Sequence, residues 1–197
     1  MKTFLQEHIE RPALSGSIAS LVLGLLGTVL ASIIIIEKIA LAENPNHITS
    51  CSFNPIVSCS PVMQSEQATA FFGIPNPIFG LIGFAVIAAL SFFSIFVKLP
   101  RFIWVINSIG MALALTFCFW LATQALYSIG ALCLYCCGVW VVTSILFWLS
   151  LRRVVVGTKF ETISDYSILG TTVTILIFAV MVFFAFQRFW LSLMGIL

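Results

Sequence analysis

The chain has 197 residues, of which 61% are hydrophobic and only 8% are charged, with a formal net charge of +2 and a mean hydropathy of +1.15. A soluble domain of this length needs far more polar surface, so the composition indicates a protein that crosses a membrane several times. The small net charge gives no indication of nucleic-acid binding. The six cysteines are not those of a secreted disulfide scaffold, because most lie within or beside apolar runs.

Five apolar runs are long enough to cross a bilayer as helices, which takes about 20 residues each. The first, residues 17–36, exceeds the roughly 7–15 apolar residues of a signal peptide and is followed by further spans, so we expect it to be retained. The other four are residues 77–97, 102–126, 131–151 and 167–186. The sequence therefore predicts an all-α membrane protein in which residues 1–197 form a single transmembrane domain.

The long connection between the first two spans, residues 39–74, carries Cys51 and Cys59 and is called the redox loop below. Ser60 followed by Pro61 is typical of a helix start. We expect a short helix from there to Phe72 that lies as a lid over the mouth of the helix bundle.

The distribution of Lys and Arg predicts a cytoplasmic N-terminus, because cytoplasmic loops carry the excess of positive charge. In this orientation the redox loop, the start of the fourth span and the C-terminus lie on the outer, oxidising side of the membrane. Seven cations would be cytoplasmic and two would be outside: Lys2, Arg11, Lys98, Arg101, Arg152, Arg153 and Lys159 against Lys38 and Arg188.

Cys133 and Cys136 form a Cys-x-x-Cys pair at the start of the fourth span. Residues three apart share one face of a helix, and the positive end of the helix dipole favours the reactive thiolate. A structural zinc site usually needs about four nitrogen or sulfur ligands, and a second Cys-x-x-Cys or a His-x-x-His is absent from the sequence. Redox chemistry is therefore favoured over a metal half-site or two inert thiols, and we predict no metal site.

Two cysteine pairs on one side of a membrane can pass electrons by thiol–disulfide exchange. The electrons then need an acceptor. The sequence has no haem ligands, dinucleotide-binding glycines or iron–sulfur spacing, so a lipid-soluble quinone within the helix bundle is the expected acceptor.

The motifs occur in a specific order: Cys51-x7-Cys59, then Ser65, then Pro75-Asn76-Pro77-Ile78-Phe79-Gly80, then Cys133-x-x-Cys136. This order resembles the vitamin K epoxide reductase family over about residues 15–150, and in particular its bacterial members that form disulfides. The resemblance implies a four-helix bundle around ubiquinone or menaquinone, a fifth helix outside the bundle, and a location in the bacterial inner membrane.

The resemblance also implies roles for the four cysteines. Cys51 would exchange with the dithiol of a partner protein, and Cys59 would form a mixed disulfide with Cys133. Cys136 would face the quinone.

Three further residues are predicted to bind the quinone. Asn76 matches a residue that hydrogen-bonds a quinone carbonyl, although an Asn before Pro77 is also a good helix N-cap. Ser65 matches a serine near the loop helix, although a solvated loop hydroxyl would look the same. Trp140 stands where vertebrate members have a tyrosine, so epoxide chemistry is not carried over.

Many bacterial members have a thioredoxin-like domain fused after the fifth helix, whereas this sequence ends at Leu197. We therefore expect a separate DsbA-like partner and a membrane thiol:quinone oxidoreductase that reoxidises it. A DsbB-like enzyme is disfavoured because its two cysteine pairs come in the opposite order. A copper carrier or assembly factor that uses Cys133, Cys136 and Cys137 as soft ligands stays open, as does a structural protein with inert disulfides.

Overall fold

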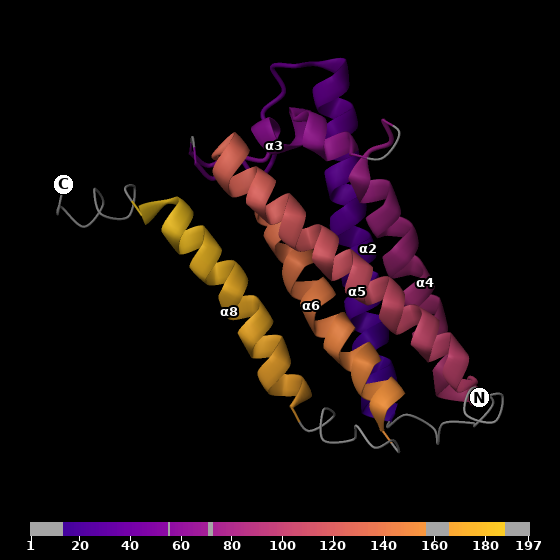
Figure 1. The fold of residues 1–197 in the computed structure, drawn as a ribbon. Helices are drawn as coiled ribbons and strands as arrows, with labels where there is room; N and C mark the ends of the chain where they lie inside the picture. Colours follow the sequence, from indigo (N-terminus) through magenta and orange to yellow (C-terminus); the bar gives the residue numbers. More distant parts are fainter. Residues whose placement is uncertain (1–13, 55, 71–72, 157–165, 188–197) are drawn as a thin grey trace.

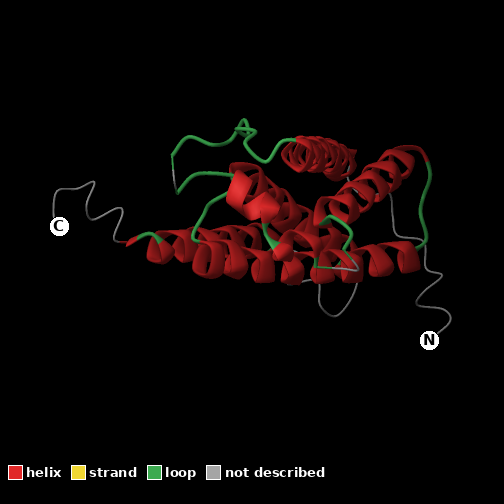
Figure 2. Cartoon of the chain, turned by 90° about the horizontal axis from the view of Figure 1, so that it is seen from above, coloured by secondary structure: helices red, strands yellow, loops and turns green. Residues whose placement is uncertain are grey.

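This computed structural model describes residues 14–54, 56–70, 73–156 and 166–187. Five long helices form the main part of these residues. They are α2 (Leu14–Glu43), α4 (Asn76–Phe96), α5 (Arg101–Thr123), α6 (Leu134–Val155) and α8 (Ser167–Ala185). Each is long and apolar enough to cross a membrane, α5 together with the π-helical turn Gln124–Ile129 that follows it. Figure 2 shows helices and loops in these residues and no strand. The prediction of an all-α membrane protein with five spans is confirmed.

α2, α4, α5 and α6 form a bundle, and α8 lies along one side of it (Figure 1). α2 packs against α4 and α6, α5 packs against α6, and α8 contacts the bundle mainly through α6. The approach of α2 to α4 depends on Gly27, because a Cβ atom there would lie 2.6 Å from the ring of Phe84. Small residues allow this kind of close helix packing in membranes.

α2 is longer than predicted and continues to Glu43, so the redox loop begins at Asn44 and not at Ile39. The sequence has no Gly or Pro between Gly27 and Pro45. Leu41 is buried in the extra turns and packs in a cluster that includes Cys59. The added length of α2 therefore reaches up beside the loop cysteines.

α6 also continues past its predicted end at Leu151, to Val155. Arg153 in its last turn is buried, lies 4.2 Å from the ring centroid of Trp104 and donates a hydrogen bond of 2.8 Å to the carbonyl of Gly16. A cation is favourable at a helix C-terminus. These contacts tie α6 to α5 and α2 at the end of the bundle away from the redox loop.

The predicted lid helix is two short helices, α3 (Ser60–Gln64) and a 3-10 helix (Glu66–Thr69). Between them Ser65 is extended, and its Oγ donates a hydrogen bond of 2.8 Å to the carbonyl of Val62, which ends α3. The last two residues of the predicted helix, 71–72, lie outside the described residues. Both short helices sit at the end of the bundle where α2 ends and α4 begins (Figure 1).

Candidate active site

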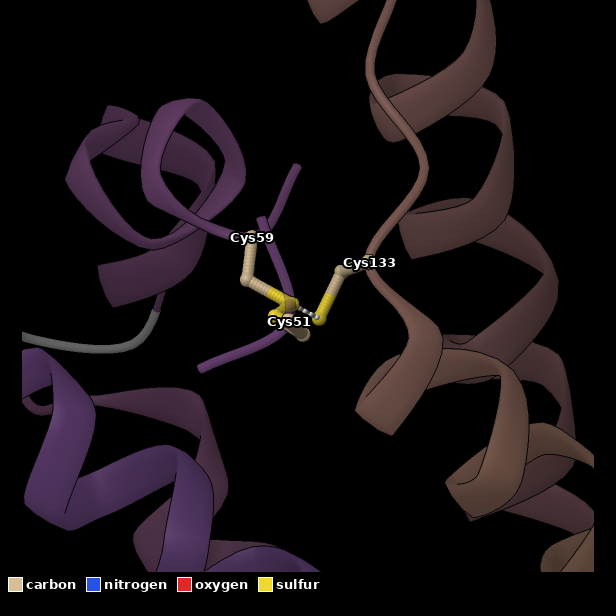
Figure 3. A group of neighbouring side chains, drawn as sticks. All are labelled: Cys51, Cys59 and Cys133. Atoms are coloured by element: carbon tan, nitrogen blue, oxygen red, sulfur yellow. Dashed lines mark hydrogen bonds between the residues drawn. A yellow bond between two sulfur atoms is a disulfide. The ribbon is translucent and has the colours of Figure 1, made fainter. Parts of the chain in front are cut away.

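Three cysteine sulfurs meet where the redox loop contacts the start of α6 (Figure 3). Cys51 and Cys59 form a disulfide with a Cα–Cα distance of 5.8 Å. The Sγ atom of Cys133 lies 3.1 Å from that of Cys59. The three Sγ atoms lie within 4.8 Å of one another, and all three residues are buried. The structure therefore brings the loop pair and the helix pair within reach for thiol–disulfide exchange.

Backbone pairing holds the redox loop against the segment that leads into α6. Val57 and Leu132 form an isolated parallel β-bridge, and the N–H of Leu132 donates a hydrogen bond of 2.7 Å to the carbonyl of Ile56. Gly130, whose φ of 73° is in the left-handed region, turns the chain out of the π-helical turn. Cys59 and Cys133 thus approach from two segments that run side by side.

The sequence had suggested that Cys133 lies in the first turn of the helix. In the structure it is instead the N-cap of α6. Its backbone is extended, and its Sγ accepts a hydrogen bond of 3.4 Å from the N–H of Cys136. The hydrogen bond with the Cys136 thiol, together with the N–H groups of Tyr135 and Cys136, holds the pKa of the Cys133 thiol below its ordinary value, against the effect of burial. The sulfur nearest the loop disulfide is therefore the one that favours the thiolate.

A cavity of about 250 Å³ is lined by α2, α4, α5, α6 and the two short helices. Of the two cysteine pairs, Cys136 is the member that lines it. Its walls are mostly apolar, as in most ligand pockets. Four predicted site residues line it: Ser65, Asn76, Cys136 and Trp140. Cys136 therefore adjoins both Cys133 and the cavity.

Asn76 is not the N-cap of α4, which corrects one of its two predicted roles. Pro75 occupies that position, and Asn76 is the first helical residue. Its side chain holds the 3-10 helix instead. Nδ2 donates a hydrogen bond of 2.6 Å to the carbonyl of Gln67, and Oδ1 accepts one of 3.0 Å from the N–H of Ala70. The amide has two N–H groups, so one is left for a molecule in the cavity.

Trp140 connects the cavity wall to α8. It is buried, and its ring stacks on Phe178 with a centroid distance of 5.2 Å and an interplanar angle of 15°. Phe178 in turn stacks on Phe119 of α5 at 4.2 Å. α8 lies outside the four-helix bundle but supports the wall of the cavity through this stack.

The remaining thiols, Cys118 and Cys137, are not part of the three-sulfur group. Cys118 is buried, lines the cavity and lies 3.9 Å from the hydroxyl of Thr143. Cys137 packs against a cluster that includes Leu115. The copper-ligand set suggested by the sequence, with Cys137, is therefore not the set that the structure groups together.

Glu37 is a site residue that the sequence analysis missed. Its Oε2 lies 3.0 Å from Nε2 of His47, and its Oε1 accepts a hydrogen bond of 3.1 Å from the N–H of Ser50. The hydroxyl of Ser50 lies 2.7 Å from that of Tyr135. The loop segment before Cys51 is thus fixed both to α2 and to the Cys-x-x-Cys motif. The sequence feature that could have identified Glu37 is a carboxylate at the end of an apolar run.

A five-span α-helical protein in which two cysteine pairs meet, and one of them lines a cavity through Cys136, belongs to the class of membrane proteins with a redox function. Residues 18–151 match the sequence model of the Vitamin K epoxide reductase family, which is more than half of the chain. The chain belongs to this family, whose members are oxidoreductases. A comparison with curated proteins gave no match.

Proposed function

We propose that the protein is a thiol:quinone oxidoreductase that reoxidises a separate extracytoplasmic DsbA-like protein and passes the electrons to a quinone. The observation that carries this proposal is the 3.1 Å separation of the Cys59 and Cys133 sulfurs beside a cavity lined by Cys136. It supplies a continuous route from the redox loop to the interior of the bundle. The product would be a disulfide in the partner, which can then oxidise exported proteins.

The route consists of balanced thiol–disulfide exchanges. A partner thiolate attacks Cys51, its second thiol resolves the mixed disulfide, and the loop pair is left reduced. The Cys59 thiolate then attacks Cys133 of a Cys133–Cys136 disulfide and releases Cys136. Finally Cys51 attacks Cys59, which re-forms the loop disulfide and leaves Cys133 and Cys136 as thiols. The Cys51–Cys59 disulfide and the free thiols of Cys133 and Cys136 are compatible with this last state.

The residues around the cavity fit a quinone. Apolar walls suit the ring, Trp140 offers a flat aromatic surface, and the remaining N–H of Asn76 can donate to a carbonyl. When bound, ubiquinone or menaquinone would supply an acceptor for two electrons and two protons. Cys136 lines the same space and would deliver them together with Cys133.

We further propose that the protein lies in the bacterial plasma membrane with its N-terminus in the cytoplasm and its cysteine pairs outside. The redox loop and the start of α6 lie at one end of the bundle (Figure 1). Arg101 and Arg153 lie at the other end, where α5 starts and α6 ends. This arrangement agrees with the positive-inside rule.

The proposal is tested with the purified full-length protein, a reduced DsbA-like protein and either ubiquinone or menaquinone. We expect one quinone to be reduced for each partner disulfide formed. Cys59→Ala, Cys133→Ala and Cys136→Ala should each abolish the coupled reaction, whereas Cys137→Ala should preserve it, because Cys137 is not among the residues that line the cavity. Partner oxidation without quinone loss, or quinone loss unaffected by these variants, would refute the proposal.

A copper carrier is the second candidate, favoured by the grouping of three sulfurs within 4.8 Å. Its ligands would be Cys51, Cys59 and Cys133, available only after reduction of the loop disulfide. Thiolates suit Cu(I). Copper in a one-to-one ratio to the reduced purified protein, together with no quinone reduction, would favour the carrier.

A further inference from the structure

Lys38 places a primary amine at the wall of the cavity. It lies on α2 and is half-buried, and its Nζ donates a hydrogen bond of 2.7 Å to the carbonyl of Met63 in α3. It lines the same cavity as Cys136. An ammonium group carries three N–H donors, so two remain after the bond to Met63.

The charge of Lys38 has no counter-ion at this wall. Among the described residues that line the cavity, Lys38 is the one with a charged side chain. The neighbouring carboxylate, Glu37, is engaged with His47 and Ser50. An unpaired charge beside an apolar space is costly. An anion in the cavity would remove this cost.

We propose that Lys38 is the cation that binds negative charge on the oxygens of the quinone ring as it is reduced. The inference rests on the proposed function and adds a residue to it. Fixed donors and charges aimed at developing negative charge favour a reaction, because they need not reorganise as the charge forms. Asn76 offers one such neutral donor, and Lys38 offers a full charge.

A cation in the cavity would favour the redox step. The thiols of Cys133 and Cys136 together lose two protons and two electrons, and an S–S bond forms between them. The two ring oxygens gain the same two protons and two electrons. Whenever electrons arrive before protons, negative charge resides on a ring oxygen. The ammonium of Lys38 offsets that charge and donates a hydrogen bond to it.

The test compares the affinities of the oxidised full-length protein for two rings of nearly the same shape. Binding is measured by the quenching of tryptophan fluorescence. One is a dimethyl naphthoquinone, which is neutral. The other has an ionised hydroxyl group in place of one methyl group. Lys38→Met should weaken binding of the anionic ring about tenfold or more, as expected for loss of a nearby opposite charge, and leave the neutral ring within about twofold.

Three further variants separate charge from shape. Lys38→Arg keeps the charge and should bind the anionic ring as the wild type does. Lys38→Gln keeps a donor for Met63 without the charge, and should lose the anionic ring but retain the neutral one. Lys98→Met is the matched control, because Lys98 is exposed in the turn between α4 and α5, and it should change neither affinity.

Equal losses for both rings in Lys38→Met and Lys38→Gln would show that Lys38 only anchors α3, and would overturn the inference. Unchanged binding of the anionic ring in Lys38→Met would overturn it as well. A wild-type protein that binds neither ring would overturn the quinone cavity itself, and the inference with it. The failure of Lys38 and the failure of the proposed function are therefore distinguishable.

Discussion

The sulfur of Cys133 lies 3.1 Å from that of Cys59, while its own residue caps the start of α6. One residue is thus in contact with the redox loop and with the helix that lines the cavity. Because Cys51 and Cys59 are already joined, Cys133 stands where a thiolate would attack or leave the loop disulfide. Cys136, the second cysteine of the Cys-x-x-Cys motif, lines the cavity, whereas Cys133 does not.

The first prediction is a trapped intermediate. In Cys136→Ala, Cys133 can attack Cys59 of the loop disulfide and release the Cys51 thiol, but the Cys136 thiol that would take Cys133 back is missing. Only the return attack by Cys51 can then reverse the Cys59–Cys133 mixed disulfide, so it should accumulate relative to the wild type. It is detected as a crosslinked peptide pair by mass spectrometry after alkylation of free thiols. Cys137→Ala, which removes the neighbouring thiol, should give no such species. Absence of the crosslink in Cys136→Ala would show that the exchange order is wrong.

The second prediction concerns pH. The pKa of the Cys133 thiol is lowered, and the largest cause is its hydrogen bond with the Cys136 side chain. Attack by Cys133 on Cys59 needs the thiolate form of Cys133. The attack should therefore proceed above this pKa and slow down as the pH falls through it. Cys136→Ser keeps a donor and Cys136→Ala does not. The midpoint for Cys59–Cys133 crosslinking should therefore lie at higher pH in Cys136→Ala.

Acid quenching at a series of pH values, followed by mass spectrometry, measures both midpoints. The wild-type backbone N–H of Cys136, which also donates to Cys133, is retained in both variants and serves as an internal control. Equal midpoints would mean that the backbone alone lowers the pKa of the Cys133 thiol.

The third prediction concerns orientation. Ile48 in the redox loop is 78% exposed, and Lys98 is exposed in the turn between α4 and α5. With the six native cysteines replaced, Ile48→Cys should react with a membrane-impermeant thiol reagent in intact cells. Lys98→Cys should react only after the membrane is opened. The reverse pattern would invert the proposed topology.

Much of the fold could be predicted from the sequence because long apolar runs in a membrane have few alternatives to a helix. The meeting of Cys59 with Cys133 followed from placing both pairs on one side and from the family resemblance. The helix ends were less predictable. α2 continues to Glu43 because Leu41 packs beside the loop cysteines, a tertiary contact that hydropathy does not encode.

The contacts that hold the redox loop were not predictable, because they join side chains to backbone groups or to residues distant in sequence. Asn76 bonds to the backbone of Gln67 and Ala70, for which no side-chain pattern exists. Lys38 entered the sequence argument only as a charge outside the membrane, yet its amine reaches the carbonyl of Met63. A polar residue at the end of an apolar run is ambiguous until the fold is known.

The fourth prediction separates the two contributions of Asn76. Asn76→Ala removes the N–H that remains for a quinone carbonyl, and it also removes two hydrogen bonds to the 3-10 helix. A donor to developing charge is worth on the order of 10–1000-fold in rate, so quinone reduction should slow by that factor. Exchange between the partner and Cys51 should change little, because the loop disulfide is held by other contacts.

Thr69→Ala is the matched control for the lid, because it breaks the hydrogen bond of 3.1 Å from the Thr69 hydroxyl to the carbonyl of Glu66 within the 3-10 helix, and Thr69 is not among the residues that line the cavity. Each lost neutral hydrogen bond costs about 1 kcal/mol of unfolding free energy, so thermal unfolding of Asn76→Ala and Thr69→Ala is measured beside the rates. If Asn76→Ala reduces quinone at the wild-type rate while its stability falls, Asn76 holds the lid and takes no part in binding the ring. If Thr69→Ala slows quinone reduction as much as Asn76→Ala does, the effect belongs to the lid and not to the amide.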